Sequence, residues 1–211
     1  MTKDFWKEWF TTEAEWFEHH YYVGCEVRNH IKQIEKTKFA HGCSKFCIID
    51  ENAGIVLKWC TNPHYNEMAK EYSFYEEAVV RGLGCYFPKT EELCTIGEVT
   101  IYVQDMVKTL MSDIPYKDRR HMTDKHKTVT DEFVRKVCRD FYSCPPYEWV
   151  RLAISIYGKR RMKELCQFTK DFRINDLHES NVGFNGSFPV ILDFCGYHRD
   201  DRYSDDENSD W

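Results

Sequence analysis

The arrangement of hydrophobic and polar residues changes along the chain and predicts three regions. Residues 1–33 place aromatic side chains at helical spacings, which predicts helices that bury this surface against the rest of the protein. From residue 34 to residue 108, β-rich runs separated by short turns predict strands around one helix. Residues 109–199 begin with a polar stretch and then show mainly helical periodicity.

The turn and capping residues give approximate limits for these elements. In the first region, Thr12 followed by Glu15 is typical of a capping box and predicts that a helix begins there. In the second region, Asn62 and Pro63 predict the start of a helix that continues to Val80. The strands of this region are expected at 38–40, 45–49, 54–59, 86–94 and 98–107.

The third region is predicted to be helical around a short loop and strand. We expect a polar loop or linker over 112–130, helices over 131–142 and 145–170 with a break near Gly158, a loop over 176–183 and a strand over 190–194. Residues 200–211 are strongly acidic and are expected to form a disordered tail. The element order predicts an α+β fold.

Composition narrows the classes of function. Of the formal net charge of −6, the tail carries −5, so the remainder of the 211 residues is close to neutral. We therefore expect no nucleic-acid partner and no membrane partner. Residues 1–18 interleave charged and aromatic side chains and no apolar run approaches membrane-spanning length, so we expect neither a signal peptide nor a transmembrane helix. The ten cysteines include no CxxC spacing, and we expect reduced, mostly buried thiols such as Cys47, Cys85, Cys138 and Cys166 in a bacterial or host-cell cytosol.

Three oxygen-bearing side chains follow a spacing that suits phosphate chemistry. Asp176 precedes Asn181 by five residues, and Asp193 ends the short apolar strand that follows. Phosphoryl transfer requires a carboxylate near the attacking hydroxyl and oxygen ligands for Mg²⁺. Hard oxygen donors are the ligands that Mg²⁺ prefers. The pattern therefore predicts a site for Mg²⁺ bridging phosphates.

The segment from 176 to 196 resembles the protein-kinase-like superfamily. Its DLHESN is similar to the catalytic loop H-R-D-L-x-x-x-N of kinases and to H-G-D-L-H-x-x-N of aminoglycoside and choline phosphotransferases, and its DFCG resembles D-F-G. The segment also looks like small kinase-like proteins of bacteriophages and bacterial effector kinases. The resemblance implies that Asp176 is the catalytic carboxylate and that Asn181 and Asp193 hold the metal. It also implies a two-lobed fold, with an antiparallel-sheet N-lobe plus helix and a truncated helical C-lobe.

Earlier segments match further parts of the same resemblance. Lys58 occupies the position of the lysine that contacts the nucleotide phosphates. Glu71 resembles the glutamate that orients this lysine, and Glu67, one turn earlier, is the alternative. The resemblance thus implies that Lys58 and Glu71 join Asp176 in the catalytic site.

Two more segments would contact the nucleotide. The turn around Gly42, Ser44 and Lys45 lies where kinases carry a glycine-rich loop, although it has a single glycine, and a simple surface turn is the alternative. Residues 104–107 resemble the hinge that binds adenine, with the carbonyl of Asp105 and the amide of Val107 as the expected contacts.

The chain departs from the kinase pattern in ways that affect substrate recognition. Ile174 and Asn175 replace the His-Arg pair, and eighteen residues follow Asp193, from which we expect no activation segment and no usual peptide-docking platform. His178 is expected to have a structural role rather than to act as a base.

The favoured function is an ATP- and Mg²⁺-dependent phosphotransferase, a minimal serine/threonine protein kinase with a protein substrate. The alternatives are a pseudokinase that acts by blocking a partner, a small-molecule kinase of the aminoglycoside or choline phosphotransferase type, and an enzyme that transfers AMP.

Overall fold

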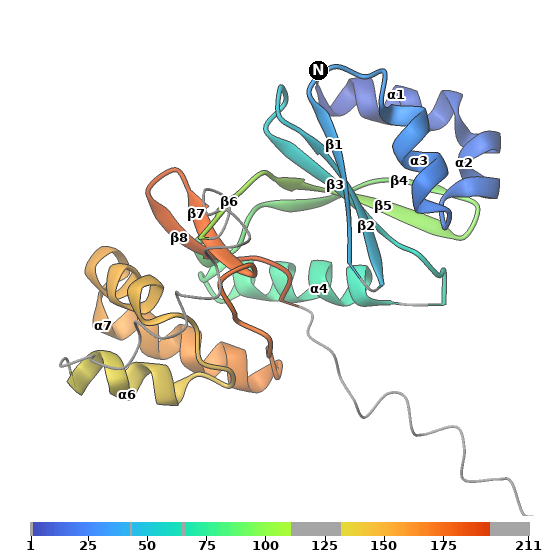
Figure 1. Ribbon diagram of the computed structural model, residues 1–211. Coiled ribbons are helices and arrows are strands. Elements are labelled where there is room, and N and C mark those ends of the chain that lie inside the picture. The colour runs from blue at the N-terminus through green and yellow to red at the C-terminus, as the bar shows by residue number, and fades with distance from the viewer. Residues whose placement is uncertain (1, 43, 65, 111–131, 195–211) are drawn as a thin grey trace, which may run out of the picture.

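The computed structural model describes residues 2–42, 44–64, 66–110 and 132–194, and Figure 1 shows their arrangement. Within this part, the chain forms a five-stranded antiparallel sheet, a three-stranded sheet and six α-helices, which is an α+β fold. The expected linker at 112–130, the tail at 200–211 and residues Cys195 and Gly196 lie outside the described residues.

The five-stranded sheet is built mainly from the strand runs that alternation predicts. Its order is β1-β2-β3-β5-β4, and all of its neighbours are antiparallel. The expectation of a strand beginning at residue 86 is wrong, because Tyr86 belongs to the short 3₁₀ helix η1 (Gly84–Tyr86). The strands are β1 (Thr37–His41), β2 (Lys45–Asp50), β3 (Ile55–Cys60), β4 (Thr90–Ile96) and β5 (Val99–Asp105).

Three N-terminal helices cover one face of this sheet (Figure 1). They are α1 (Lys3–Thr12), α2 (Ala14–His20) and α3 (Gly24–Ile31). Their fully buried aromatic side chains, which include Trp6 and Phe17, pack with Leu57 and Trp59 of β3. The predicted capping box is wrong: Thr12 ends α1, and α2 begins after Glu13 without a side-chain cap.

The N-terminal helices are also joined to the sheet by a polar contact. The indole nitrogen of Trp6 donates to the Asp50 carboxylate at 2.8 Å, and Asp50 also accepts the amides of Asn52 and Ala53. Asp50 is completely buried. These three hydrogen bonds therefore compensate for burying its carboxylate.

Helix α4 (Glu67–Val80) covers the opposite face of the sheet (Figure 1). It begins later than Asn62 and Pro63 predict, because the Asn62 side chain accepts the His64 amide at 2.9 Å and forms a local turn. Its end is as expected, since Gly82 follows with a left-handed φ of 70°. Met68 packs with Cys60 and Tyr102 of the sheet in a small separate cluster, whereas Ala78 packs with the helical part of the molecule, so α4 contacts both parts.

The second core lies in the helical part of the molecule. It combines α6 (Glu132–Asp140) and α7 (Tyr147–Asp171) with Phe87 and Phe194. The expected break in α7 is present, because Gly158 has φ 83° and ψ 162° inside the helix. None of the described helices combines the length and apolar character that crossing a membrane requires.

A small sheet next to this core was not predicted as a unit. Its order is β6-β7-β8, formed by β6 (Lys108–Thr109), β7 (Val182–Asn185) and β8 (Phe188–Ile191). The strand expected at 190–194 therefore begins and ends earlier. This sheet joins the segment after β5 to the segment that carries Asp176 and Asp193.

Candidate functional site

Lys58 and Glu71 form an ion pair between the sheet and α4. The period of two along β3 directs Leu57 and Trp59 to the N-terminal helices and Lys58 to the opposite face, against α4. Lys58 Nζ lies 3.1 Å from Glu71 Oε1, and the Glu71 side chain is completely buried. Glu67, the alternative partner, instead lies 3.9 Å from the thiol of Cys60.

Glu71 has two further partners that the sequence analysis did not assign to it. Lys45 Nζ lies 3.2 Å from Oε2, and Gln104 Nε2 donates to Oε1 at 3.1 Å. Burial alone would raise the pKa of Glu71, but the ammonium groups of Lys58 and Lys45 outweigh it and lower the pKa to about 2. Glu71 is therefore a buried carboxylate that stays ionised between two lysines.

Lys45 also contacts Asp193, which connects the sheet to the segment after β8. Its ammonium forms an ion pair with Asp193 Oδ1. Lys45 is at the start of β2, and the period of two places it on the same face as Cys47, which is paired with Lys58 of β3. This alternation along β2 is the sequence signal that places Lys45 on the face of the sheet where Lys58 lies.

Asp176, Asn181 and Asp193 are joined through the backbone. The Asn181 side-chain amide donates to the Asp176 carbonyl at 3.0 Å and lies 3.5 Å from its carboxylate. The amide of Leu192, the neighbour of Asp193, donates to the Asn181 carbonyl at 2.7 Å. A series of contacts therefore leads from Lys58 through Glu71 and Lys45 to Asp193, and from Leu192, the next residue along the backbone, through Asn181 to Asp176.

Both aspartates have unusual backbone conformations. Asp176 has φ 65° and Asp193 has φ 39°, in the left-handed region that residues other than glycine rarely adopt. Such conformations persist only where the surroundings fix them, and they concentrate at functional sites. Lys36 and Arg173 share this conformation, with φ 58° and 50°, so positive φ alone does not mark the two aspartates as functional.

His178 lies beside Asp176 in a defined orientation. Its Nδ1 accepts the Ser180 amide at 3.1 Å, and its Nε2 lies 3.6 Å from Asp176 Oδ1. Because Nδ1 acts as an acceptor, the neutral ring carries its proton on Nε2, facing Asp176. The hydrogen bond to the Ser180 amide is in keeping with the expected structural role, whereas the separation of 3.6 Å from Asp176 is too long for a hydrogen bond.

The turn around Gly42 is closed by its own hydrogen bonds. The Gly42 amide donates to the Lys45 carbonyl at 2.9 Å, and the Ser44 carbonyl accepts the Thr61 amide at 2.9 Å. Residue 43 lies outside the described residues. The Gly42 amide is therefore used within the turn in this conformation, and Lys45 is the residue of the turn that reaches the ion pairs.

The predicted hinge, residues 104–107, contains the buried side chain of Gln104 and backbone amides that differ in their hydrogen bonds. The amides of Asp105 and Met106 donate to the carbonyls of Lys89 and Gly54. The Val107 amide donates to no backbone carbonyl within the described part of the chain. Gln104, in contrast, turns its side chain inward to Glu71 and to Thr90 Oγ1.

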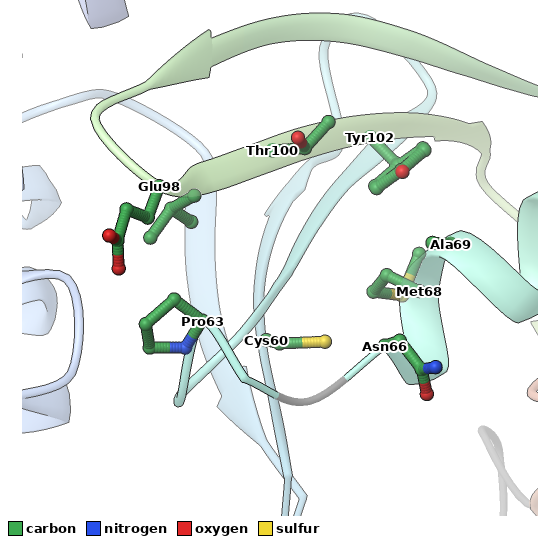
Figure 2. A pocket seen from close by; sticks show the side chains of 9 residues that line it. Cys60, Pro63, Asn66, Met68, Ala69, Glu98, Thr100 and Tyr102 are labelled. Carbon is green, nitrogen blue, oxygen red and sulfur yellow. The ribbon is translucent and has the colours of Figure 1, made fainter.

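A separate pocket lies near the beginning of α4 (Figure 2). Its volume is about 160 Å³, and Glu98 is the one charged side chain of its described lining. Its electrostatics are therefore unsuited to a polyphosphate, and its position differs from that of the ion pairs. The lining is Cys60, Pro63, Asn66, Met68, Ala69, Glu98, Val99, Thr100 and Tyr102.

The described cysteine, histidine and acidic side chains neither cluster as metal ligands nor form disulfides. No group of three or more His, Cys, Asp or Glu side chains forms a metal site among the described residues. The eight described cysteines are free, and Cys25, Cys85 and Cys144 are exposed, so the expectation that Cys85 is buried is wrong. Burial raises the pKa of the Cys47 thiol to about 11, despite the lysines nearby.

Comparisons of this chain with protein-family models, with curated proteins and with solved structures found no match.

Proposed function

We propose that this chain is an ATP- and Mg²⁺-dependent phosphotransferase of the protein-kinase-like superfamily that acts on a protein hydroxyl. The observation that carries the proposal is the buried Glu71 carboxylate between Lys58 and Lys45, joined through Asp193 and Asn181 to Asp176. Phosphoryl transfer needs cations for the phosphates, oxygen ligands for Mg²⁺ and a carboxylate for the hydroxyl. This series of contacts contains each of these groups.

Each residue then has a defined role. Lys58, oriented by Glu71, binds the α and β phosphates. Asp176 accepts the proton of the attacking hydroxyl as the hydroxyl oxygen bonds to the γ phosphorus and the bond between the γ phosphorus and ADP breaks. Asp105 and Val107 bind adenine through the main chain. Gly42, Ser44 and Lys45 lie next to the phosphates.

The described residues fit a magnesium ion bound together with nucleotide. Mg²⁺ is commonly held by one or two carboxylates plus substrate phosphates and water, so a larger acidic cluster is not required. Asn181 directs its side-chain nitrogen to Asp176, which leaves its side-chain oxygen for the metal, and its backbone carbonyl accepts the amide of Leu192, the neighbour of Asp193. Bound Mg²⁺ would neutralise negative charge on the phosphates.

The proposal includes the kinase-like arrangement of two lobes. Residues 34–108 form the nucleotide-binding lobe, and residues 109–199 form a shortened helical lobe. The separation of the buried side chains into one core at the sheet and another at α6 and α7 supports this division. The free cysteines are in keeping with a reducing cytosol.

Two measurements test the function. First, we expect ATP with Mg²⁺ at about 100 times its dissociation constant to raise the free energy of unfolding by about 2.7 kcal/mol. Second, protein incubated with γ-labelled ATP and cell lysate should transfer the label. Asp176→Ala should lower this transfer by about 100-fold or more, the usual contribution of a positioned acid–base group. Asp4→Asn, an exposed carboxylate in α1, is the matched control.

A second candidate function is nucleotide binding without transfer. The ion pair between Lys45 and Asp193 favours it, because the lysine ammonium then neutralises the carboxylate that the first proposal assigns to the metal. Stabilisation by nucleotide with no transferred label, and a biological effect unchanged in Asp176→Ala, would support this second function. Mass spectrometry of labelled products distinguishes phosphate from AMP, and a labelled small molecule would indicate a small-molecule kinase. Absence of stabilisation at millimolar nucleotide would contradict both candidates.

A further inference from the structure

Lys45 interacts with two carboxylates of different kinds. Glu71 is completely buried and is also held by Lys58, whereas 43% of the Asp193 side chain is exposed. The Lys45 side chain itself is only 12% exposed. Among these four side chains, two positive and two negative charges balance.

This balance opposes the binding of a metal ion alone. A cation that binds Asp193 has to take the position of the Lys45 ammonium or lie beside it, and like charges repel at such short range. Displacing the ammonium leaves a mostly buried positive charge with one partner fewer, which is costly. Bare Mg²⁺ therefore meets a carboxylate that is already neutralised.

Nucleotide phosphate changes the balance. Its negative charge offers Lys45 a new partner and compensates for the added metal charge. Lys45 can then leave Asp193 while it keeps its contact with Glu71, 3.2 Å away. The metal and the nucleotide thus each make the binding of the other more favourable.

We propose that Lys45 is a positioning residue that neutralises Asp193 until nucleotide binds. When nucleotide binds, Lys45 moves from Asp193 to the phosphates, and the Asp193 carboxylate becomes available as a ligand for the metal. This inference rests on the proposed function. It adds that metal binding is coupled to nucleotide binding through one lysine. Lys58 does not have this function, because its carboxylate partner is Glu71.

The experiment compares metal binding with and without nucleotide in four proteins. These are the wild type, Lys45→Met, Lys45→Arg and the control Lys38→Met, in which the lost lysine pairs with Glu51 at the surface. Mn²⁺ binding is measured by electron paramagnetic resonance, first alone and then with a non-hydrolysable ATP analogue. Thermal unfolding verifies that each variant is folded.

We expect Lys45→Met to bind Mn²⁺ alone about tenfold more tightly than the wild type, a typical effect of one neighbouring charge on a carboxylate. The ATP analogue should strengthen Mn²⁺ binding strongly in the wild type and much less in Lys45→Met. Lys45→Arg and Lys38→Met should behave like the wild type. If Lys45→Met does not fold, the comparison is made with Lys45→Gln.

The possible outcomes separate the two proposals. If the wild type binds the analogue with Mn²⁺ but Lys45→Met changes neither Mn²⁺ affinity nor its coupling to the analogue, the role of Lys45 is wrong and the proposed function stands. If the wild type does not bind the analogue, the proposed function fails, and the transfer of Lys45 to phosphate fails with it. If, in that case, Lys45→Met also binds Mn²⁺ alone as the wild type does, the proposal that Lys45 neutralises Asp193 is excluded as well.

Discussion

Gln104 and Lys58 donate to the same oxygen of Glu71, each at 3.1 Å. The glutamine comes from the end of β5 and the lysine from β3, so two neighbouring strands hold one side chain of α4. Gln104 is itself fixed by Thr90 of β4. The orientation of Glu71 is thus determined by the sheet as well as by its own helix.

Replacing Gln104 by Met should therefore destabilise the protein. We expect a loss of about 2 kcal/mol, typical of a hydrogen bond to a charged group, measured by urea denaturation. Gln167→Met removes an exposed hydrogen bond to Asp171 and should change stability by less than about 0.5 kcal/mol. Equal effects of the two substitutions would contradict the role assigned to Gln104.

The lowered pKa of Glu71 predicts a specific loss of stability in acid. Its pKa falls from 4.5 to about 2 on folding, since its two lysines outweigh the effect of burial. A carboxyl group with a lowered pKa stabilises the fold above the unfolded pKa, and this contribution disappears as pH falls from about 4.5 to about 2.

Unfolding free energies measured across this pH range test the assignment. Glu71→Gln should be less stable than the wild type by about 3–5 kcal/mol at neutral pH, the usual cost of removing one partner of a buried ion pair. It should also lose less stability between pH 4.5 and 2. Glu8→Gln, at an exposed position of α1, should follow the wild-type curve, and a parallel curve for Glu71→Gln would rule out this source of acid sensitivity.

Gly183 should not tolerate alanine. An added Cβ would lie 2.3 Å from the Lys108 carbonyl oxygen and 2.8 Å from Thr109 Cα, which are backbone atoms that side-chain movement cannot relieve. We expect a loss of about 1–3 kcal/mol, the usual cost of overpacking, measured by thermal unfolding. At Gly42, the nearest atom to such a Cβ lies 3.9 Å away, so Gly42→Ala is the control that should be much milder.

The indole nitrogen of Trp6 should contribute to the stability of the protein in addition to its buried ring. Trp6→Phe keeps an aromatic ring but leaves the buried Asp50 carboxylate with the two backbone amides alone. We expect a destabilisation of about 1–3 kcal/mol in urea denaturation. Trp9→Phe, which changes a half-buried ring, is the control, and an equally large loss there would attribute the effect to ring size.

The sequence alone predicted the elements whose pattern of alternating residues, or whose helix-breaking residue, lies within the element itself. The strands β1, β2 and β3 and the break at Gly158 were predicted close to their observed positions. The beginning of α4 was not, because Asn62 has the same side-chain preference for a helix cap and for an isolated turn. The two-residue strand β6 is too short to show any periodicity.

The ion pairs show a similar division between local and distant information. The pair between Lys58 and Glu71 follows from the face of β3 and the position in α4. The contact between Lys45 and Asp193 joins residues 148 positions apart, and neither local pattern contains the other partner. Such contacts depend on how the sheet and the helical part are arranged, which the pattern of one element cannot specify.

Helix α4 packs against the five-stranded sheet at one end and against the core of α6 and α7 at the other, and this has a mechanical consequence for Glu71. Met68, three residues before Glu71, packs on the sheet side, while Ala78, seven residues after it, is anchored with the α6 and α7 core. A tilt between the sheet and the helical part would therefore turn the helix on which Glu71 sits. The contacts of Glu71 with Lys58 and Lys45 would therefore change with the angle between the sheet and the helical part.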